Sequence, residues 1–288
     1  MKPAPFQWHP ASSLDEAVAL LARYAPEDGR VIAGGQSLVP SMALRVALPA
    51  HLIDINGIAS LARLEVEAGR LSIGACVRHA AFEHPVEPGV LGRLLATVAA
   101  NIAHAPIRTR GTFCGSLANA DPASEWCLVA ATLGATLVAV SARGTREVAA
   151  ADWFHGIMTT ALAEDELLAE ARLPLLETDA RAGFHEFSRR AGDYALAMSL
   201  CTFRVVEGRM REARVGVGGV EPQPRRIPEA ERLLEGERPE PETFARAARA
   251  AADAVDPLED IRTRAAYRRD LVAASVRRSL QAACDDTH

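Results

Sequence analysis

The sequence predicts an α+β protein built from three lobes, and three observations carry this prediction. The chain has 288 residues, which exceeds the usual size of a single domain. Apolar residues make up 49% of the chain and charged residues 24%, so a sizeable core can form. Helical and strand-like patterns follow one another along the chain with no internal repeat. We expect the lobes at residues 1–60, 61–177 and 178–288.

The first lobe should open with a helix over Leu14–Tyr24. Ser13 and Glu16 have the spacing of a capping box, and apolar residues recur on one face of the helix. An apolar strand that starts at Val31 then runs directly into two glycines, and a second strand-like piece follows at residues 52–55. This order predicts a compact β-α-β-like lobe.

The second lobe should begin with a hairpin of residues 62–66 and 71–75 around Gly69 and Arg70. Residues 108–125 lose all periodicity and are rich in glycine and small polar residues, which predicts a long loop. Helices are expected on both sides of that loop, at 91–102 and 126–133, and a strand at 136–140.

The third lobe should follow a boundary near residues 174–181, where polarity rises and the pattern loses its period. Apolar and polar residues alternate over 197–207 and 211–217, which predicts an antiparallel hairpin. A proline-rich connector at 221–228 leads to three helices, expected at 229–234, 242–255 and 265–283.

Charge and cysteine content exclude several functions. The formal net charge of −5 argues against a nucleic-acid partner, and Lys2 is the only lysine, so a catalytic lysine is not expected elsewhere. The five cysteines form no C-x-x-C pair or other metal-ligand spacing, so we expect no metal site and a reducing compartment. No apolar run is long enough for a membrane span, and no secretion signal is apparent, so the expected location is the cytoplasm.

Two glycine-containing segments are candidates for ligand binding. The turn of Ala33, Gly34, Gly35, Gln36 and Ser37 follows a strand, and its backbone N–H groups could hold a phosphate without any lysine. An ordinary tight turn is the alternative. The second segment, residues 108–125, combines a flexible backbone with hydroxyls, an amide and two carboxylates, a mixture that suits a polyhydroxylated, phosphorylated ligand.

A third candidate is the segment 184–195, in which Tyr194 follows a charged turn, in a chain with few aromatic residues. This tyrosine could stack on a planar ligand. A surface cluster of ion pairs with a packed tyrosine is the alternative. No nucleophile motif and no paired Cys and His indicate a catalytic residue in this chain.

Six motifs, in order along nearly the whole chain, resemble the FAD-binding medium subunit of the molybdenum hydroxylases, the family that contains aerobic carbon monoxide dehydrogenase and xanthine dehydrogenase. Six matches at suitable separations are far more specific than one. They are AGGQSLVP at 33–40, PIRTRGTFCGSLANADPASEW at 106–126, DWFHGIMTTALAEDELL at 152–168, SRRAGDYALA at 188–197, VGGVEPQPRR at 217–226 and DIRTRAAYRRDL at 260–271.

The resemblance implies a two-lobed FAD-binding domain followed by a C-terminal α+β domain. It also implies contacts to FAD. The glycine turn and its neighbours would hold the diphosphate, the second loop would close on it and on the sugar and ribityl hydroxyls, and an apolar and an aromatic side chain would lie by the flavin. These residues are Ala33, Gly34, Gly35, Gln36, Ser37 and Leu38; Thr112, Gly115, Ser116, Asn119, Ser124 and Glu125; and Leu168 and Tyr194.

The resemblance further implies an oxidoreductase subunit that takes electrons from 2Fe–2S clusters of a small subunit, reduced by a large molybdopterin subunit, and passes them through FAD to an external acceptor. A dimer of heterotrimers is the implied assembly. A docking subunit of the same fold that has lost flavin is the alternative. A stand-alone NAD-dependent reductase would need a Rossmann fingerprint, which the chain lacks.

Three positions depart from the family pattern. Cys114 stands where many members have glycine, and Gln36 stands where some have histidine. His185 and Glu186 occupy a neighbourhood where some members carry a lysine, so the charge near the flavin would be less positive here.

Overall fold

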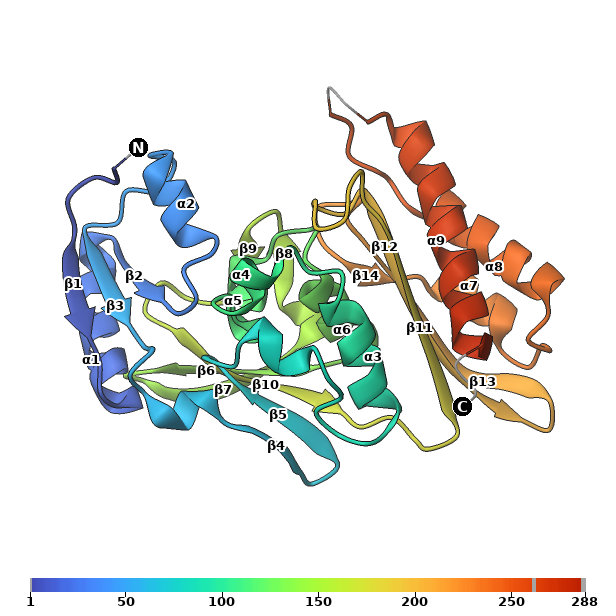
Figure 1. Ribbon diagram of the computed structural model, residues 1–288, viewed down its shortest axis with the longest axis horizontal. Helices are drawn as coiled ribbons and strands as arrows, with labels where there is room; N and C mark the ends of the chain where they lie inside the picture. Colours follow the sequence, from blue (N-terminus) through green and yellow to red (C-terminus); the bar gives the residue numbers. More distant parts are fainter. Residues whose placement is uncertain (1, 261–262, 286–288) are drawn as a thin grey trace.

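The computed structural model describes residues 2–260 and 263–285 of the chain, so Ile261 and Arg262 of the last motif lie outside the described residues. Helices and strands are mixed in three regions that lie side by side along the long axis (Figure 1). The predicted α+β class is confirmed.

The first region is a three-stranded parallel sheet of order β1-β3-β2 with a helix on each face (Figure 1). Side chains alternate between the two faces, as the pleat requires: Ile53 packs with the α1 side and Leu52 with the α2 side. The elements are β1 (Gln7–Pro10), α1 (Leu14–Tyr24), β2 (Gly29–Ile32), α2 (Leu38–Ala43) and β3 (His51–Asp54).

Helix α1 begins and ends where the sequence predicts. The Ser13 hydroxyl accepts a hydrogen bond from the N–H of Glu16, and the Glu16 carboxylate accepts from Ser12 rather than from Ser13. The predicted N-terminal cap therefore forms, but the second hydrogen bond of the capping box goes to the N–H of Ser12 instead of the N–H of Ser13.

The second region is a five-stranded antiparallel sheet of order β4-β5-β10-β6-β7, with α3 to α6 above it in Figure 1. Trp126, Phe113 and Phe82 pack together in its core, with ring centroids 4.8 to 5.6 Å apart. The elements are β4 (Leu64–Glu67), β5 (Arg70–Gly74), α3 (Val90–Ala99), α4 (Ala105–Arg108), α5 (Phe113–Asn119), α6 (Glu125–Leu133), β6 (Thr136–Ser141), β7 (Gly144–Ala149) and β10 (Leu167–Pro174), with a small hairpin of β8 (Phe154–Gly156) and β9 (Thr159–Thr160).

The expectation of one long loop at residues 108–125 is wrong. Helix α5 lies inside it, because the Thr112 hydroxyl caps the N–H of Gly115 and the buried Phe113 and Leu117 anchor one face. Glycine, serine and asparagine lower the intrinsic helix propensity of this segment, so it is tertiary packing that makes the segment helical.

The third region is an antiparallel sheet of order β11-β12-β13-β14, with the last three helices on one face and α3 and α6 against the other. The predicted hairpin at its centre is β12 paired with β13, and Gly183 of β11 lets the last helix approach closely. The elements are β11 (Ala180–Phe187), β12 (Ala197–Val206), β13 (Arg209–Gly218), β14 (Arg225–Arg226), α7 (Pro228–Leu234), α8 (Pro241–Ala254) and α9 (Ala265–Asp285).

Candidate functional site

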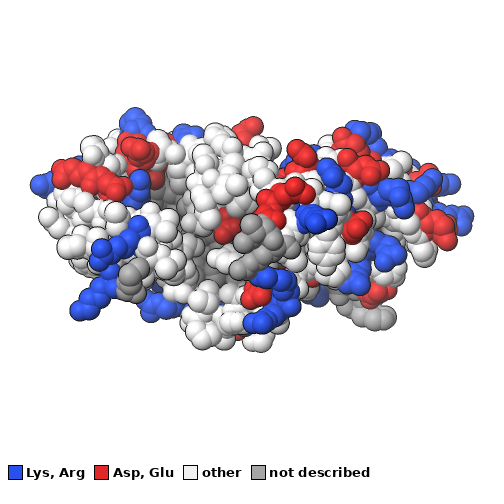
Figure 2. Space-filling view, turned by 90° about the horizontal axis from the view of Figure 1, so that it is seen from above, with Lys and Arg blue, Asp and Glu red and all other residues white. Residues whose placement is uncertain are grey.

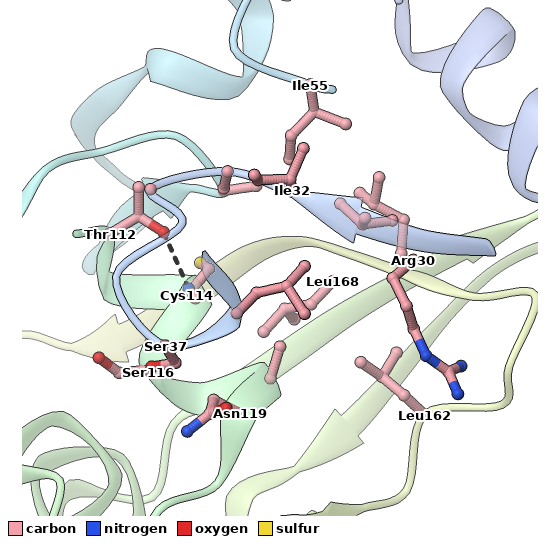
Figure 3. A pocket seen from close by; sticks show the side chains of 18 of the residues that line it. Arg30, Ile32, Ser37, Ile55, Thr112, Cys114, Ser116, Asn119, Leu162 and Leu168 are labelled. Atoms are coloured by element: carbon pink, nitrogen blue, oxygen red, sulfur yellow. Dashed lines mark hydrogen bonds between the residues drawn. The ribbon is translucent and has the colours of Figure 1, made fainter. Parts of the chain in front are cut away.

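A cavity of about 420 Å³ lies between the first and second regions. Most of its lining comes from three chain segments: the end of β2 with the glycine turn, helix α5 with the residues just before it, and the segment from β9 into β10 (Figure 3). Viewed from above, the middle of the molecule is hollowed and carries few charged side chains, while charges of both signs gather toward the two ends (Figure 2).

The glycine turn presents a row of free donors to this cavity. Among the described residues, none of the five backbone N–H groups from Gly34 to Leu38 donates to a protein acceptor. Gly35 has a left-handed φ of 72°, which turns the chain tightly, and the Gln36 amide donates to the Gly34 carbonyl at 3.2 Å. A run of unpaired N–H groups in such a turn is an anion-binding arrangement.

Gly34 brings the turn into contact with the second region. A Cβ on Gly34 would lie 2.3 Å from the Arg110 carbonyl oxygen and 2.7 Å from the Cα of Gly111. Both distances are too short for any other residue at this position. The two glycine-containing segments that the sequence singles out are therefore in direct contact.

Cys114 lines the cavity, and its thiol is buried in the cavity wall. The side chain is buried, and its Sγ lies 3.4 Å from the Ile73 carbonyl oxygen, to which the thiol donates. Burial raises the pKa of this thiol, so it stays protonated. The departure from glycine at this position is accommodated in the core of the second region.

His79 also lines the cavity, although no motif in the sequence points to it. Its backbone N–H donates to the Gly111 carbonyl at 2.9 Å, and its Nδ1 accepts from the Trp126 indole at 2.9 Å, which places the ring proton on Nε2. Burial, with Arg78 and Arg108 nearby, lowers the pKa of His79 to about 4, so the imidazole is neutral at ordinary pH. The only sequence signal was its position just after a strand.

The cavity gathers most of the residues that the sequence singled out. The glycine turn, the capped start of α5 and the start of β10 meet there, while Ser124, Glu125 and Tyr194 lie outside it. Lining the cavity are Ala33, Gly34, Gly35, Gln36, Ser37, Leu38, Thr112, Gly115, Ser116, Asn119 and Leu168. Arg30 and Leu162, which the sequence did not single out, line it as well.

A second group of side chains lies at the junction with the third region. Glu125, at the start of α6, and Glu186, on β11, place their carboxyl groups in hydrogen-bonding contact. Burial, reinforced by neighbouring carboxylates, raises the pKa of Glu125 to about 7 and that of Glu186 to about 8. Ionising both carboxyl groups at this short separation would cost electrostatic free energy, so the pair shares one proton near neutral pH.

Tyr194 belongs to this second group and not to the wall of the cavity. Its side chain is 75% exposed, and burial of its inner part, with Asp121 and Glu125 nearby, raises the pKa of the phenol. A largely exposed ring of this kind can pack against a planar ligand.

The described residues contain no group of three His, Cys, Asp or Glu side chains placed to hold a metal ion. Among the helices in the described ranges, 2–260 and 263–285, none is both long and apolar enough to cross a membrane.

Comparison with known proteins agrees with this geometry. Residues 4–176 match the family described as FAD binding domain in molybdopterin dehydrogenase, and residues 182–283 match the CO dehydrogenase flavoprotein C-terminal domain. The chain is 36% identical to the nicotine 6-hydroxylase medium subunit of Paenarthrobacter nicotinovorans, over 97% of this chain and 98% of that one.

Two solved structures share the whole fold. Carbon monoxide dehydrogenase from Hydrogenophaga pseudoflava superimposes with a TM-score of 0.94 at 34% identity, covering 99% of each chain. Quinoline 2-oxidoreductase from Pseudomonas putida 86 gives a TM-score of 0.92 at 35% identity, covering 100% of each chain. The cradle of free N–H groups, the two touching loops and these similarities together lead to one conclusion: the chain belongs to the FAD-binding medium subunits of the molybdenum hydroxylases, and it is an oxidoreductase subunit.

Proposed function

We propose that this subunit holds FAD in the cavity between its first two regions and relays electrons from 2Fe–2S clusters of a small partner subunit to an external acceptor. The observation that carries the proposal is the run of five unpaired N–H groups from Gly34 to Leu38 beside the cavity. When bound, FAD supplies the two-electron redox centre. This chain supplies the binding and the orientation.

The residues around the cavity fit such a cofactor. The N–H groups of the glycine turn, with the Ser37 and Ser116 hydroxyls, line the cavity and would hold the diphosphate, and no lysine is needed because these dipoles act at short range. Thr112 holds the second loop in shape through its bond to Gly115. Asn119, at the end of α5, would reach the sugar or ribityl hydroxyls.

The residues outside the cavity take the exposed end of the cofactor in this proposal. Ser124 and Glu125 would contact the ribityl chain, and Tyr194 would lie against the isoalloxazine ring. Because Glu125 and Glu186 share one proton, this pair of carboxyl groups carries one negative charge and not two beside the flavin end of the cofactor. Leu168 lines the cavity with the glycine turn, so its contact is to the part of the cofactor held there.

The partners in this proposal are a small iron–sulfur subunit and a large molybdopterin subunit, in a dimer of heterotrimers in the cytoplasm. The names of the relatives support this arrangement, since they are medium subunits or medium chains of multi-subunit enzymes. The molybdenum subunit would select the substrate, and this chain would not. A docking subunit without flavin is not favoured, because residues 4–176 match the FAD-binding domain family and the glycine turn keeps its unpaired N–H groups.

The test is to express the chain alone and with its partner subunits. We expect the isolated chain to bind added FAD with quenching of flavin fluorescence, and Gly34→Asp to abolish that binding while the partners still assemble with it. Isolated wild-type chain that remains colourless after incubation with excess FAD would refute the proposal and favour the flavin-free docking subunit. Metal analysis of the co-purified complex would identify the iron–sulfur and molybdenum partners.

A further inference from the structure

The side chain of Asn56, just after β3, bonds to the backbone at the start of the glycine turn. Its Nδ2 donates to the Ala33 carbonyl at 2.9 Å and to the Asp54 carboxylate at 2.6 Å. Its Oδ1 accepts from the guanidinium of Arg78, which belongs to the second region. The amide has two N–H donors and one carbonyl, and all three are engaged, so its orientation is fixed.

The bond to Ala33 determines the direction of the next N–H along the chain. The Ala33 carbonyl and the Gly34 N–H belong to one planar trans peptide group, in which the C=O and the N–H point in opposite directions. Because the carbonyl is held toward Asn56, the N–H is held away from it. Ala33 and Gly34 line the cavity and Asn56 does not, so the Gly34 N–H is turned to the cavity side.

The next two peptide groups of the turn are held in the same way. The Gln36 side chain donates to the Gly34 carbonyl at 3.2 Å, and the Val39 N–H donates to the Gly35 carbonyl at 2.9 Å. These two bonds come from within the turn and α2, whereas Asn56 reaches the turn from beyond β3. Loss of the Asn56 amide would therefore release the first peptide group of the row and leave the next two in place.

Arg78 connects this arrangement to the second region. One nitrogen of its guanidinium donates to Asn56, and another donates to the Arg110 carbonyl. That carbonyl oxygen is the atom that a Cβ on Gly34 would meet at 2.3 Å. One guanidinium thus bonds to the residue that holds the glycine turn and to the loop that the turn touches.

We propose that Asn56 is a positioning residue of the anion site: it directs the Gly34 N–H at the diphosphate, and Arg78 holds Asn56 in place. A donor that already points at its acceptor needs no ordering when the ligand binds, so affinity is gained without a new contact. Asn56 does this without touching the cofactor. The inference rests on the function proposed above.

The test measures FAD affinity of the isolated apoprotein by fluorescence titration, and the phosphorus NMR resonances of the bound diphosphate. Asn56→Ala should weaken FAD binding by about three- to tenfold, the range expected for one hydrogen bond. It should also move the phosphorus resonances toward those of free FAD, because the Gly34 N–H is no longer held. The matched control is Asn101→Ala, whose amide also donates to a main-chain carbonyl, that of Thr97, at 2.9 Å, but away from the cavity. It should change neither quantity.

A second variant guards against a folding defect. Asn56→Leu keeps nearly the size of the side chain but neither donates nor accepts, and it should reproduce both effects of Asn56→Ala; because Asn56 is exposed, the melting temperatures should stay close to the wild type. Unchanged FAD affinity would overturn the inference. So would weaker binding with unmoved phosphorus resonances, since the role of Asn56 would then be structural only. Failure of the wild-type chain to bind FAD at all would instead refute the proposed function, so the two failures are distinguishable.

Discussion

The carboxyl group of Glu125 on α6 contacts that of Glu186 on β11, across the junction between the second and third regions. Asp121 adds a further negative charge near Glu125. The contact between the two carboxyl groups costs least in free energy while they share one proton. Its stability should therefore depend on pH.

We predict that Glu186→Gln stabilises the protein at alkaline pH. The pKa of Glu186 is raised in the folded state, from an ordinary value of 4.5 to about 8, so its contribution to stability is complete below pH 4.5 and is lost as pH rises through 8. Glutamine cannot ionise, and the variant should gain on the order of 1–2 kcal/mol over the wild type at pH 9 relative to pH 5. Urea unfolding at both pH values checks this.

The control for this prediction is Glu207→Gln, at an exposed position in the turn between β12 and β13. It should shift stability by the same small amount at both pH values. If the free energy of unfolding of Glu186→Gln differs from that of the wild type by the same amount at pH 5 and at pH 9, the two carboxyl groups do not share a proton.

Gly34→Ala should loosen the contact between the first two regions. Its methyl group would overlap the Arg110 carbonyl, at 2.3 Å, and the backbone there cannot move without shifting the loop before α5. We expect a loss of about 1–3 kcal/mol in stability and at least tenfold weaker FAD binding. Gly57→Ala is the matched control, because its added Cβ meets only the Ala11 carbonyl, at 3.2 Å. Equal FAD affinity in both variants would contradict the assignment of Gly34 to the FAD site.

His79→Gln should alter the acid side of the stability profile. The pKa of His79 falls from 6.5 to about 4 on folding, so its neutral form stabilises the protein above pH 6.5, and this contribution is lost as pH falls toward 4. The variant should be less stable than the wild type at pH 7, because the glutamine amide lies at the position of Nε2 and not of the Nδ1 that accepts from the Trp126 indole, and the difference should shrink by pH 4.5. Denaturant titrations at the two pH values measure it, with the exposed His155→Gln as a variant that should show no such trend.

Cys114→Ala should leave FAD affinity within about twofold of the wild type while lowering stability by about 1 kcal/mol. The reason is that the buried thiol, although Cys114 lines the cavity, donates to the Ile73 carbonyl, so its removal leaves a small void in the wall of the cavity. Flavin fluorescence titration and thermal unfolding separate the two effects. Cys201→Ala, equally buried in the third region, should show a comparable loss of stability, and a large loss of FAD affinity confined to Cys114→Ala would mean that the thiol contacts the cofactor.

Local patterns in the sequence predicted the elements whose stability is local. Helix α1 appears over Leu14–Tyr24 because Ser13 caps it, and the β12–β13 hairpin follows the alternation of its residues. Strand β1 could not be predicted, because Gln7–Pro10 has no apolar alternation and forms only by pairing with β3, more than forty residues away.

The same distinction applies to the site. The glycine turn and the α5 segment were found from composition, since small residues and unpaired N–H groups are local properties. Arg30, His79 and the pairing of Glu125 with Glu186 depend on contacts between distant segments, and single residues of these types occur throughout any chain. Tertiary structure alone distinguishes them from solvated side chains.

The contact between Gly34 and Gly111 bears on how the first two regions can move relative to each other. Backbone meets backbone at this point, so no flexible side chain lies between the two loops to absorb a displacement. A rotation of the first region against the second would therefore carry the loop before α5 with it, and the two walls of the cavity keep a fixed separation here.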